Sequence, residues 1–237
     1  LHIIIRKIRM SQKQKWLSFM SIAFGLFTAV MDASMIGIAL PSISKDFSLD
    51  LSSAAWISLV STITVVAVLL PMGNISDRVG RKKIYLYGVI IMAAGSLFSS
   101  FSNEIISLLI FRIIVSIGAA MRMSTGLAMV MMIFKDKERG KGLGANTTTV
   151  GLAAITGPIF GGFLVGNFGW ESIFITQALL SLPTYLLGFY FLNKDVVDSN
   201  HNHRKGNFDF TGSIISAIAF SVLLFTINYC LLYTSPS

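Results

Sequence analysis

Long apolar segments alternate with short polar clusters along the chain. Each apolar segment has about the length needed to cross a hydrocarbon core roughly 30 Å thick, at about 1.5 Å of rise per helical residue. A membrane β-barrel would instead alternate apolar and polar residues over strands of about ten residues, and the sequence lacks that alternation. The pattern predicts an all-α polytopic membrane protein with seven helices, over residues 16–40, 52–72, 84–101, 105–134, 142–165, 172–192 and 210–233.

Prolines are expected to shape three of these helices. Pro41 should end the first one, because proline has no backbone N–H to donate and its ring clashes with the preceding turn. Pro183 should kink the sixth helix, and Pro158 should allow the fifth to bend.

The composition agrees with the hydrophobic pattern. Hydrophobic residues make up 54% of the chain and charged residues 13%, whereas charged residues are about 25% of a typical soluble domain. The single cysteine, Cys230, excludes an intramolecular disulfide and a multi-cysteine metal site. The first apolar segment is too long for a signal peptide, so we expect it to remain as a helix.

Lysine and arginine gather in the loops on one side of the predicted bundle. Residues 1–15 carry five of these bases and no acid, residues 73–83 carry four bases and one acid, and residues 135–141 carry four bases and two acids. The loops on the opposite side contain one base, Lys45. The positive-inside rule therefore predicts a multi-pass protein of the cell (plasma) membrane with a cytoplasmic N-terminus. This topology accounts for the net charge of +8 without a nucleic-acid partner.

The basic segment over residues 73–83 is expected to form a tight turn between the second and third helices. Its sequence is Gly-Asn-Ile-Ser-Asp-Arg-Val-Gly-Arg-Lys-Lys. Positive charge alone would orient such a loop, and that explanation is enough for Arg81, Lys82 and Lys83. It does not require Asp77 or either glycine, so these residues indicate a further role.

Three ionisable residues fall inside predicted helices: Asp32, Arg112 and Arg122. Each would cost at least about 2.5–3.5 kcal/mol at a lipid-facing helix centre, so each should face the bundle interior. Asp32 and Arg112 lie at similar depth, roughly 13 Å and 10 Å from the same side. We expect them to form an ion pair that binds and releases a proton, or else a static pair that joins two helices. Arg122 is nearer the cytoplasmic side and is expected to snorkel to the membrane surface.

Small residues recur every four positions in the fifth predicted helix, at Ala153, Gly157 and Gly161. Such a face lets a second helix approach closely. Together with Pro158 and Gly162, the face indicates a hinge or gating surface, with ordinary tight helix packing as the alternative.

These segments resemble the motifs of the major facilitator superfamily, and specifically those of its fourteen-helix drug:proton antiporters. Residues 73–86 resemble the signature of the loop between helices 2 and 3, and residues 111–120 resemble the helix-4 motif. Residues 157–162 are similar to the antiporter motif of helix 5, and residues 31–41 to the helix-1 motif. The chain departs from the usual residues of the helix-4 and helix-1 motifs at Val115, Ser116, Ser34 and Gly37.

The resemblance implies a six-helix N-terminal transporter half over residues 16–192, built from two inverted three-helix repeats. A cytoplasmic loop over 193–209 and a seventh helix over 210–233 would follow, and residues 234–237 are expected to be a non-native tail of a truncated product. The implied partners are membrane lipids, protons, a small organic substrate and the missing C-terminal half, with no cofactor.

The resemblance also implies the roles of individual residues. Asp32 and Arg112 would couple transport to protons, with a proton gradient driving efflux of drug-like or amphipathic compounds. The helix-5 antiporter motif would comprise Gly157, Pro158, Gly161 and Gly162. The gate on the cytoplasmic side would comprise Gly73, Asp77, Arg78, Gly80 and Arg81.

Two alternatives remain open: uptake or facilitated transport of a metabolite, and a membrane sensor that transports nothing. An enzyme is not expected, because the sequence contains no metal-ligand cluster, nucleophile elbow or phosphate-binding loop. His201 and His203 are expected to lie in a solvated polar loop without a metal.

Overall fold

Six long helices account for most of the chain that the structure describes. The computed structural model describes residues 11–193, apart from the side chain of Asp136, and the single positions 219, 222 and 226. The predicted seventh helix and the loop before it therefore lie almost entirely outside the described residues. The helices are α1 (Gln12–Asp46), α2 (Leu51–Val79), α3 (Arg81–Ser99), α4 (Ile105–Ile133), α5 (Arg139–Phe168) and α6 (Glu171–Phe191), with a short 3-10 turn, η1 (Asp136–Glu138), before α5.

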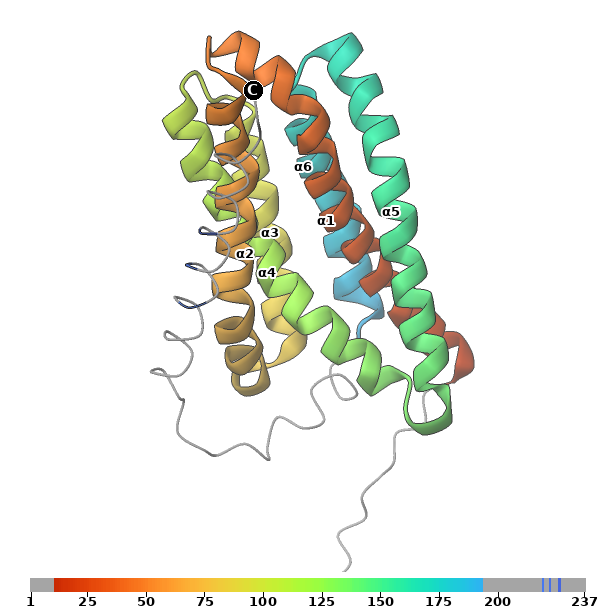
Figure 1. Cartoon of the computed structure of the whole chain (residues 1–237). Coiled ribbons are helices and arrows are strands. Elements are labelled where there is room, and N and C mark those ends of the chain that lie inside the picture. The colour runs from red at the N-terminus through yellow and green to blue at the C-terminus, as the bar shows by residue number, and fades with distance from the viewer. Residues whose placement is uncertain (1–10, 194–218, 220–221, 223–225, 227–237) are drawn as a thin grey trace, which may run out of the picture.

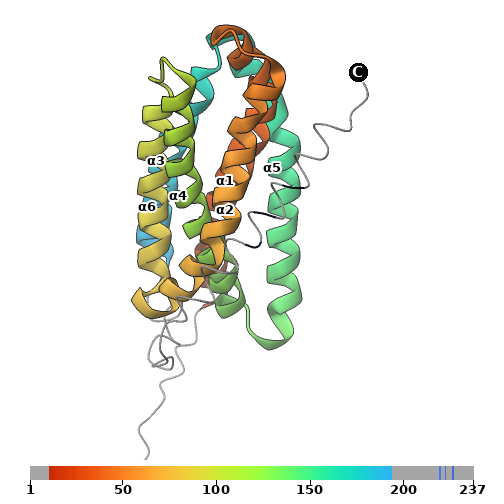
Figure 2. The ribbon, with the colours of Figure 1, turned by 60° about the vertical axis from the view of Figure 1, so that its left-hand side comes forward.

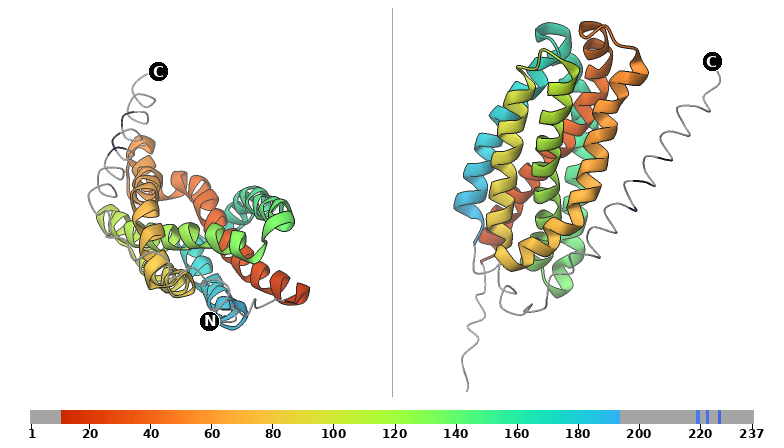
Figure 3. Two further views of the ribbon diagram at one scale, coloured as in Figure 1. Left: turned by 90° about the horizontal axis from the view of Figure 1, so that it is seen from below. Right: turned by 90° about the vertical axis from the view of Figure 1, so that its left-hand side faces the viewer.

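The helices pack as two groups of three (Figure 1). One group contains α2, α3 and α4, and the other contains α1, α5 and α6; α3 packs against α6 to join them. Figure 2 shows α3 beside α6, and Figure 3 shows the same bundle from below and from the side. The first helix of the chain thus lies with α5 and α6, whereas α4 lies with α2 and α3.

Connections alternate between the two ends of the bundle. The α1–α2, α3–α4 and α5–α6 connections lie at the upper end in Figure 1, and the α2–α3 and α4–α5 connections lie at the lower end with the start of α1. At the lower end, Lys15 Nζ lies 2.6 Å from Glu138 Oε2. At the upper end, Trp170 Nε1 donates to Asp46 Oδ2 at 2.7 Å. The basic segments over residues 73–83 and 135–141 therefore lie at one end, together with the described start of α1, as the sequence predicts.

Five of the described helices are long and apolar enough to cross a membrane: α1, α2, α4, α5 and α6. The 19-residue α3 begins with three basic residues and does not meet that criterion. The outer surface is apolar as well, since α5 exposes Ile155, Ile159 and Phe163 at successive turns. The described chain is therefore an all-α membrane protein with five apolar spans.

The prediction that Pro41 ends the first helix is wrong, because α1 continues to Asp46. A proline removes one backbone hydrogen bond from a helix. The turn that follows is held by tertiary packing, since Ile43 is fully buried in a cluster with Ile57 and Trp170. Burial of these side chains therefore outweighs the tendency of Pro41 to end the helix.

The predicted turn over residues 73–83 is also wrong. Helix α2 continues through Val79 and α3 begins at Arg81, so that Gly80 alone separates them. Gly80 has φ 111°, a backbone conformation that glycine adopts without steric cost. Gly73, Asp77 and Arg78 therefore belong to the last turns of α2, and Arg81 opens α3.

Candidate functional site

A buried ion pair joins α1 to α4 inside the bundle. Arg112 Nη1 lies 3.2 Å from Asp32 Oδ2 and 3.4 Å from Asp32 Oδ1. The two residues are 2% and 3% exposed. Arg112 Nε also donates to Ser61 Oγ of α2 at 3.3 Å, and the guanidinium lies 5.7 Å from the ring centroid of Phe174 of α6. The ion pair predicted from helix depth is present, and four helices meet at it.

The interpretation of Arg122 as a snorkelling side chain is wrong. Arg122 is 3% exposed and extends from α4 toward α1. Its Nη2 donates to Thr28 Oγ1 at 2.8 Å and to the carbonyl oxygen of Gly25, and its Nη1 lies 2.8 Å from Met92 Sδ. Its Nε has no hydrogen-bond acceptor within the described residues. A second arginine therefore lies inside the bundle.

Glycines on two neighbouring helices make room for Arg122. A Cβ at Gly88 of α3 would lie 3.0 Å from Arg122 Cγ, and a Cβ at Gly25 of α1 would lie 3.2 Å from Arg122 Nη2. On α4 itself, Gly118 packs against the backbone of α3, because a Cβ there would lie 2.6 Å from the carbonyl oxygen of Gly88. Gly25 and Gly88 are the sequence signal for an inward-facing arginine, and they become informative only once the pairing of helices is known.

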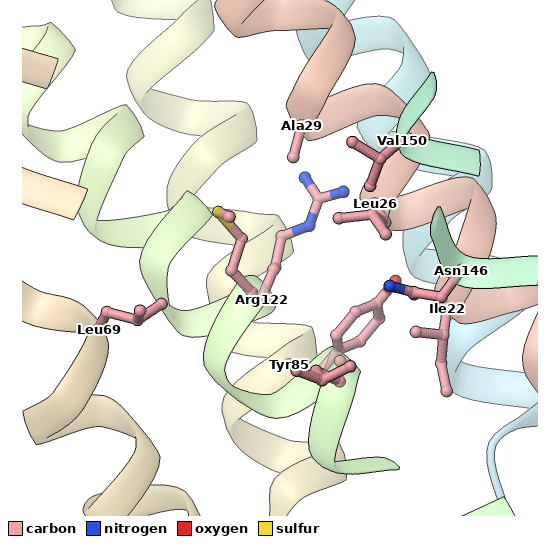
Figure 4. A pocket seen from close by; sticks show the side chains of 11 residues that line it. Ile22, Leu26, Ala29, Leu69, Tyr85, Arg122, Asn146 and Val150 are labelled. Carbon is pink, nitrogen blue, oxygen red and sulfur yellow. The ribbon is translucent and has the colours of Figure 1, made fainter. Parts of the chain in front are cut away.

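A cavity of about 250 Å³ adjoins Arg122. Figure 4 shows the guanidinium reaching toward Ala29 and Leu26, with the ring of Tyr85 beside it. The lining is apolar apart from three polar side chains, those of Arg122, Tyr85 and Asn146. Five helices contribute to the lining, through Ile22, Leu26, Ala29, Leu69, Tyr85, Arg122, Met123, Gly126, Leu127, Asn146 and Val150. A concave apolar space with few polar groups is typical of a small-molecule site.

The predicted gate residues lie at the lower end of the bundle, away from the buried ion pair. Arg81 Nη2 lies 2.7 Å from Asp77 Oδ1, so an ion pair bridges the break at Gly80. Arg81 Nη1 also lies 2.7 Å from Met132 Sδ, near the end of α4. Arg78 lies in the last turn of α2, and Gly73 lies two turns before its end. The pair thus links the end of α2 to the start of α3, and the contact with Met132 links both to α4.

Lys82 ties the same end of the bundle to α6. Its Nζ donates to the carbonyl oxygens of Phe189 and Leu192 at 2.8 Å and 2.7 Å. A cation at a helix C-terminus also interacts favourably with the helix dipole. The basic segment therefore has a structural function besides its expected effect on topology.

The small residues of the fifth helix pack against α1. A Cβ at Gly157 would lie 2.7 Å from the Cβ of Ser34, and a Cβ at Gly161 would lie 3.1 Å from Met35 Cγ. Pro158 is partly buried within an unbroken α5. Gly162 is different, because a Cβ there would meet nothing within 4 Å. The face at Gly157 and Gly161 is thus a close helix contact, directly beside the α1 turn that carries Asp32.

Potential metal ligands do not gather in the part of the chain that the structure describes. Within that part, no group of three or more His, Cys, Asp and Glu side chains could hold a metal ion. His201 and His203 lie outside the described residues.

The fold and the composition of the helices define an all-α membrane protein with a buried ion pair and an internal cavity. The sequence model for the Major Facilitator Superfamily matches residues 22–237, and the chain therefore belongs to this superfamily. This is a family of transporters and not of enzymes.

Similar proteins include transporters with different substrates. The chain is 34% identical over 216 residues to the riboflavin transporter RibZ of Clostridioides difficile (strain 630), covering 91% of this chain and 46% of RibZ. It is 29% identical over 212 residues to the multidrug resistance protein Stp of Mycobacterium tuberculosis (strain CDC 1551 / Oshkosh), covering 89% of this chain and 38% of Stp. The chain thus spans about half the length, or less, of the curated relatives it matches.

Solved transporters share the fold. A crystal structure of the peptide transporter POT in complex with sulfate aligns with a TM-score of 0.70 at 16% identity, covering 92% of this chain and 46% of that one. A bacterial homologue of the human lysosomal transporter Spinster, in an inward-facing and unoccupied conformation, aligns with a TM-score of 0.64 at 20% identity, covering 78% and 44%. At these levels of identity, the two comparisons show a shared arrangement of helices.

Proposed function

We propose that the chain forms the N-terminal half of a secondary transporter that couples the movement of a small organic solute to protons. The observation that carries this proposal is the buried contact of Asp32 with Arg112, 3.2 Å apart inside the bundle. Charged residues within membrane helices are costly and generally functional. The chain belongs to a superfamily of transporters, and in a transporter such a pair can couple the movement of a solute to protons.

The ion pair of Asp32 with Arg112 would hold α1 against α4 in a way that depends on protonation. A proton on the carboxylate of Asp32 removes its charge and weakens its attraction for the guanidinium of Arg112. The two helices can then move apart, and loss of the proton restores the contact. Because α5 packs on the same turn of α1 through Gly157, a shift of α1 would carry α5 with it.

Efflux of drug-like or amphipathic compounds by proton antiport is the favoured direction. The motif over residues 157–162 supports it, as do multidrug resistance relatives such as Stp. Transport of a metabolite resembling riboflavin is the second candidate, and the 34% identity to RibZ favours it. The apolar cavity beside Arg122 is the proposed place for part of the solute in either case.

We further propose that the lower end of the bundle faces the cytoplasm, because the basic connections lie there. The exchange of α1 and α4 between the two groups of three helices supports a pair of related three-helix repeats. A seventh helix and a second half of the transporter would complete the cavity, with Asp77 and Arg81 holding the cytoplasmic side against that half.

Proton movement in membrane vesicles that contain the complete transporter tests the proposal. Riboflavin and chloramphenicol, a neutral drug-like compound, are added separately under a pH gradient, and an internal pH-sensitive dye reports the proton flux. Asp32→Asn should abolish solute-dependent proton flux while membrane insertion remains. Asp46→Asn, which removes an acid at the end of the same helix, is the matched control and should retain it. Equal fluxes for wild type and Asp32→Asn would refute the proposal, and the sign of the flux separates efflux from uptake.

A further inference from the structure

The interior of the bundle carries an unbalanced positive charge. Among the described residues, the buried charged side chains are Asp32, Arg112 and Arg122. The carboxylate of Asp32 contacts Arg112, which leaves Arg122 without an acid in contact. The acceptors that Arg122 does have, Thr28 Oγ1, the carbonyl oxygen of Gly25 and Met92 Sδ, are neutral. Neutral acceptors satisfy N–H groups but leave the charge itself uncompensated in a poorly solvated interior.

Arg122 is also directed at the cavity. It belongs to the lining, and Figure 4 shows its guanidinium extending among Ala29 and Leu26. Its Nε is buried and lacks an acceptor among the described residues, so the hydrogen-bonding capacity of the planar guanidinium is not used up by the protein. A guanidinium with open donors is suited to a carboxylate or a similar oxyanion. The rest of the lining is apolar, apart from Tyr85 and Asn146.

We propose that the cavity binds a small organic anion, with its acidic group against Arg122 and its apolar body against Ile22, Leu26 and Leu127. This inference rests on the proposed transport function for its biological role. It narrows the class of transported solute to small organic anions. The same charge disfavours organic cations at this position, because a second positive charge in the cavity would be repelled. With about 250 Å³ of space, the body would be small, since ligand sites generally measure roughly 300–1,000 Å³.

A purely structural Arg122 is the competing explanation. In that case the guanidinium would only fasten α4 to α1 through Thr28 and Gly25, and the charge of a ligand would not matter. The two explanations differ in one measurable property, the preference among ligands that share a body but differ in charge.

Three probes with the same two-ring body make this comparison: 2-naphthoate, 2-naphthamide and 2-naphthylmethylamine, which is cationic at neutral pH. The complete transporter is placed in lipid nanodiscs, and binding is measured by equilibrium dialysis against protein-free nanodiscs. We expect naphthoate to bind at least about tenfold more tightly than the amide, and the amine to bind most weakly. Binding needs no proton gradient, so this assay and the proton-flux assay fail independently.

Variants of Arg122 test whether this side chain causes the preference for the carboxylate probe. Arg122→Gln should reduce naphthoate affinity to that of the amide, whereas Arg122→Lys should keep the carboxylate preferred. Arg139→Gln removes an exposed positive charge at the start of α5 and is the matched control, with the preference expected unchanged. Thermal unfolding reports whether each variant folds; if Arg122→Gln does not, the order of the probes on wild type and on Arg122→Lys decides. The inference is overturned if the amine binds as well as naphthoate, if folded Arg122→Gln keeps the preference, or if naphthoate binds no better than to empty nanodiscs.

Discussion

Gly157 of α5 lies against Ser34 of α1 so closely that a Cβ at the glycine would stand 2.7 Å from the Cβ of Ser34. Cβ atoms in proteins do not approach one another to that distance, so Gly157→Ala must separate the two helices. We predict a destabilisation of about 1–3 kcal/mol, the usual cost of overpacking. The midpoint of thermal unfolding in detergent measures it.

Gly162→Ala is the matched control for that variant. It lies on the same helix, but a Cβ there meets nothing within 4 Å. Alanine is also the better helix former, by roughly 0.5–1 kcal/mol. The midpoint should stay unchanged or rise, and equal losses for the two variants would contradict the described packing of α5 on α1.

The Asp32–Arg112 pair should show strong coupling in unfolding experiments. Removing one partner leaves a buried charge uncompensated, at a typical cost of about 3–5 kcal/mol. Asp32→Leu and Arg112→Met should each destabilise the chain, and the double variant should lose less than the sum of the two. A double-mutant cycle of unfolding free energies measures the difference, expected at roughly 0.5–3 kcal/mol. Simple additivity would mean that the two side chains do not interact.

Gly80 should tolerate a side chain poorly. Its φ of 111° lies in a region that L-residues rarely adopt, and strain of this kind costs of order 1–3 kcal/mol. Gly80→Ala should lower the unfolding midpoint and loosen the junction of α2 and α3. Gly140→Ala, at a glycine with open space around it and no unusual φ, serves as the comparison. A Gly80→Ala variant as stable as Gly140→Ala would argue against the sharp break between the two helices.

The contact of Glu138 with the start of α1 should depend on pH. The hydrogen bond from Lys15 and the one from Gln12 hold the pKa of Glu138 below its ordinary value. A depressed carboxyl pKa contributes stability above the pKa of the unfolded chain, about 4.3, and loses it as the pH falls through the folded-state pKa.

Glu138→Gln tests that dependence. The variant should unfold at a lower temperature than wild type at pH 7, and the difference should vanish at a pH below the folded-state pKa. Because both side chains of this pair are partly exposed to solvent, the effect at pH 7 should be small and should weaken with added salt. A difference that grows toward acid pH would contradict the assigned direction.

The six described helices and the main ion pair could be predicted from the sequence because they depend on length and depth. Apolar segments long enough to span a membrane can be recognised directly in the sequence. Counting residues from each helix end then places Asp32 and Arg112 at a similar depth in the membrane. The face at Gly157 and Gly161 was predictable for a similar reason, since a repeat of four residues maps directly onto one side of a helix.

Features that depend on packing between helices could not be predicted in this way. Arg122 appeared to lie near a membrane surface, and only the pairing of α4 with α1 and α3 shows that Gly25 and Gly88 leave space for it inside. Pro41 marked a helix end by local preference, but burial of Ile43 carries α1 beyond it. The cavity needs side chains from five helices and has no signal in any one segment.

In the proposed transporter, Asp32 takes up and releases a proton as the solute binds. Infrared difference spectroscopy on the complete transporter in lipid, recorded on adding solute, detects this directly through the carbonyl stretch of a protonated carboxyl group. The account predicts a change in that band for wild type and its absence in Asp32→Asn. A spectrum without the band in wild type, or with the same band in Asp32→Asn, would contradict it.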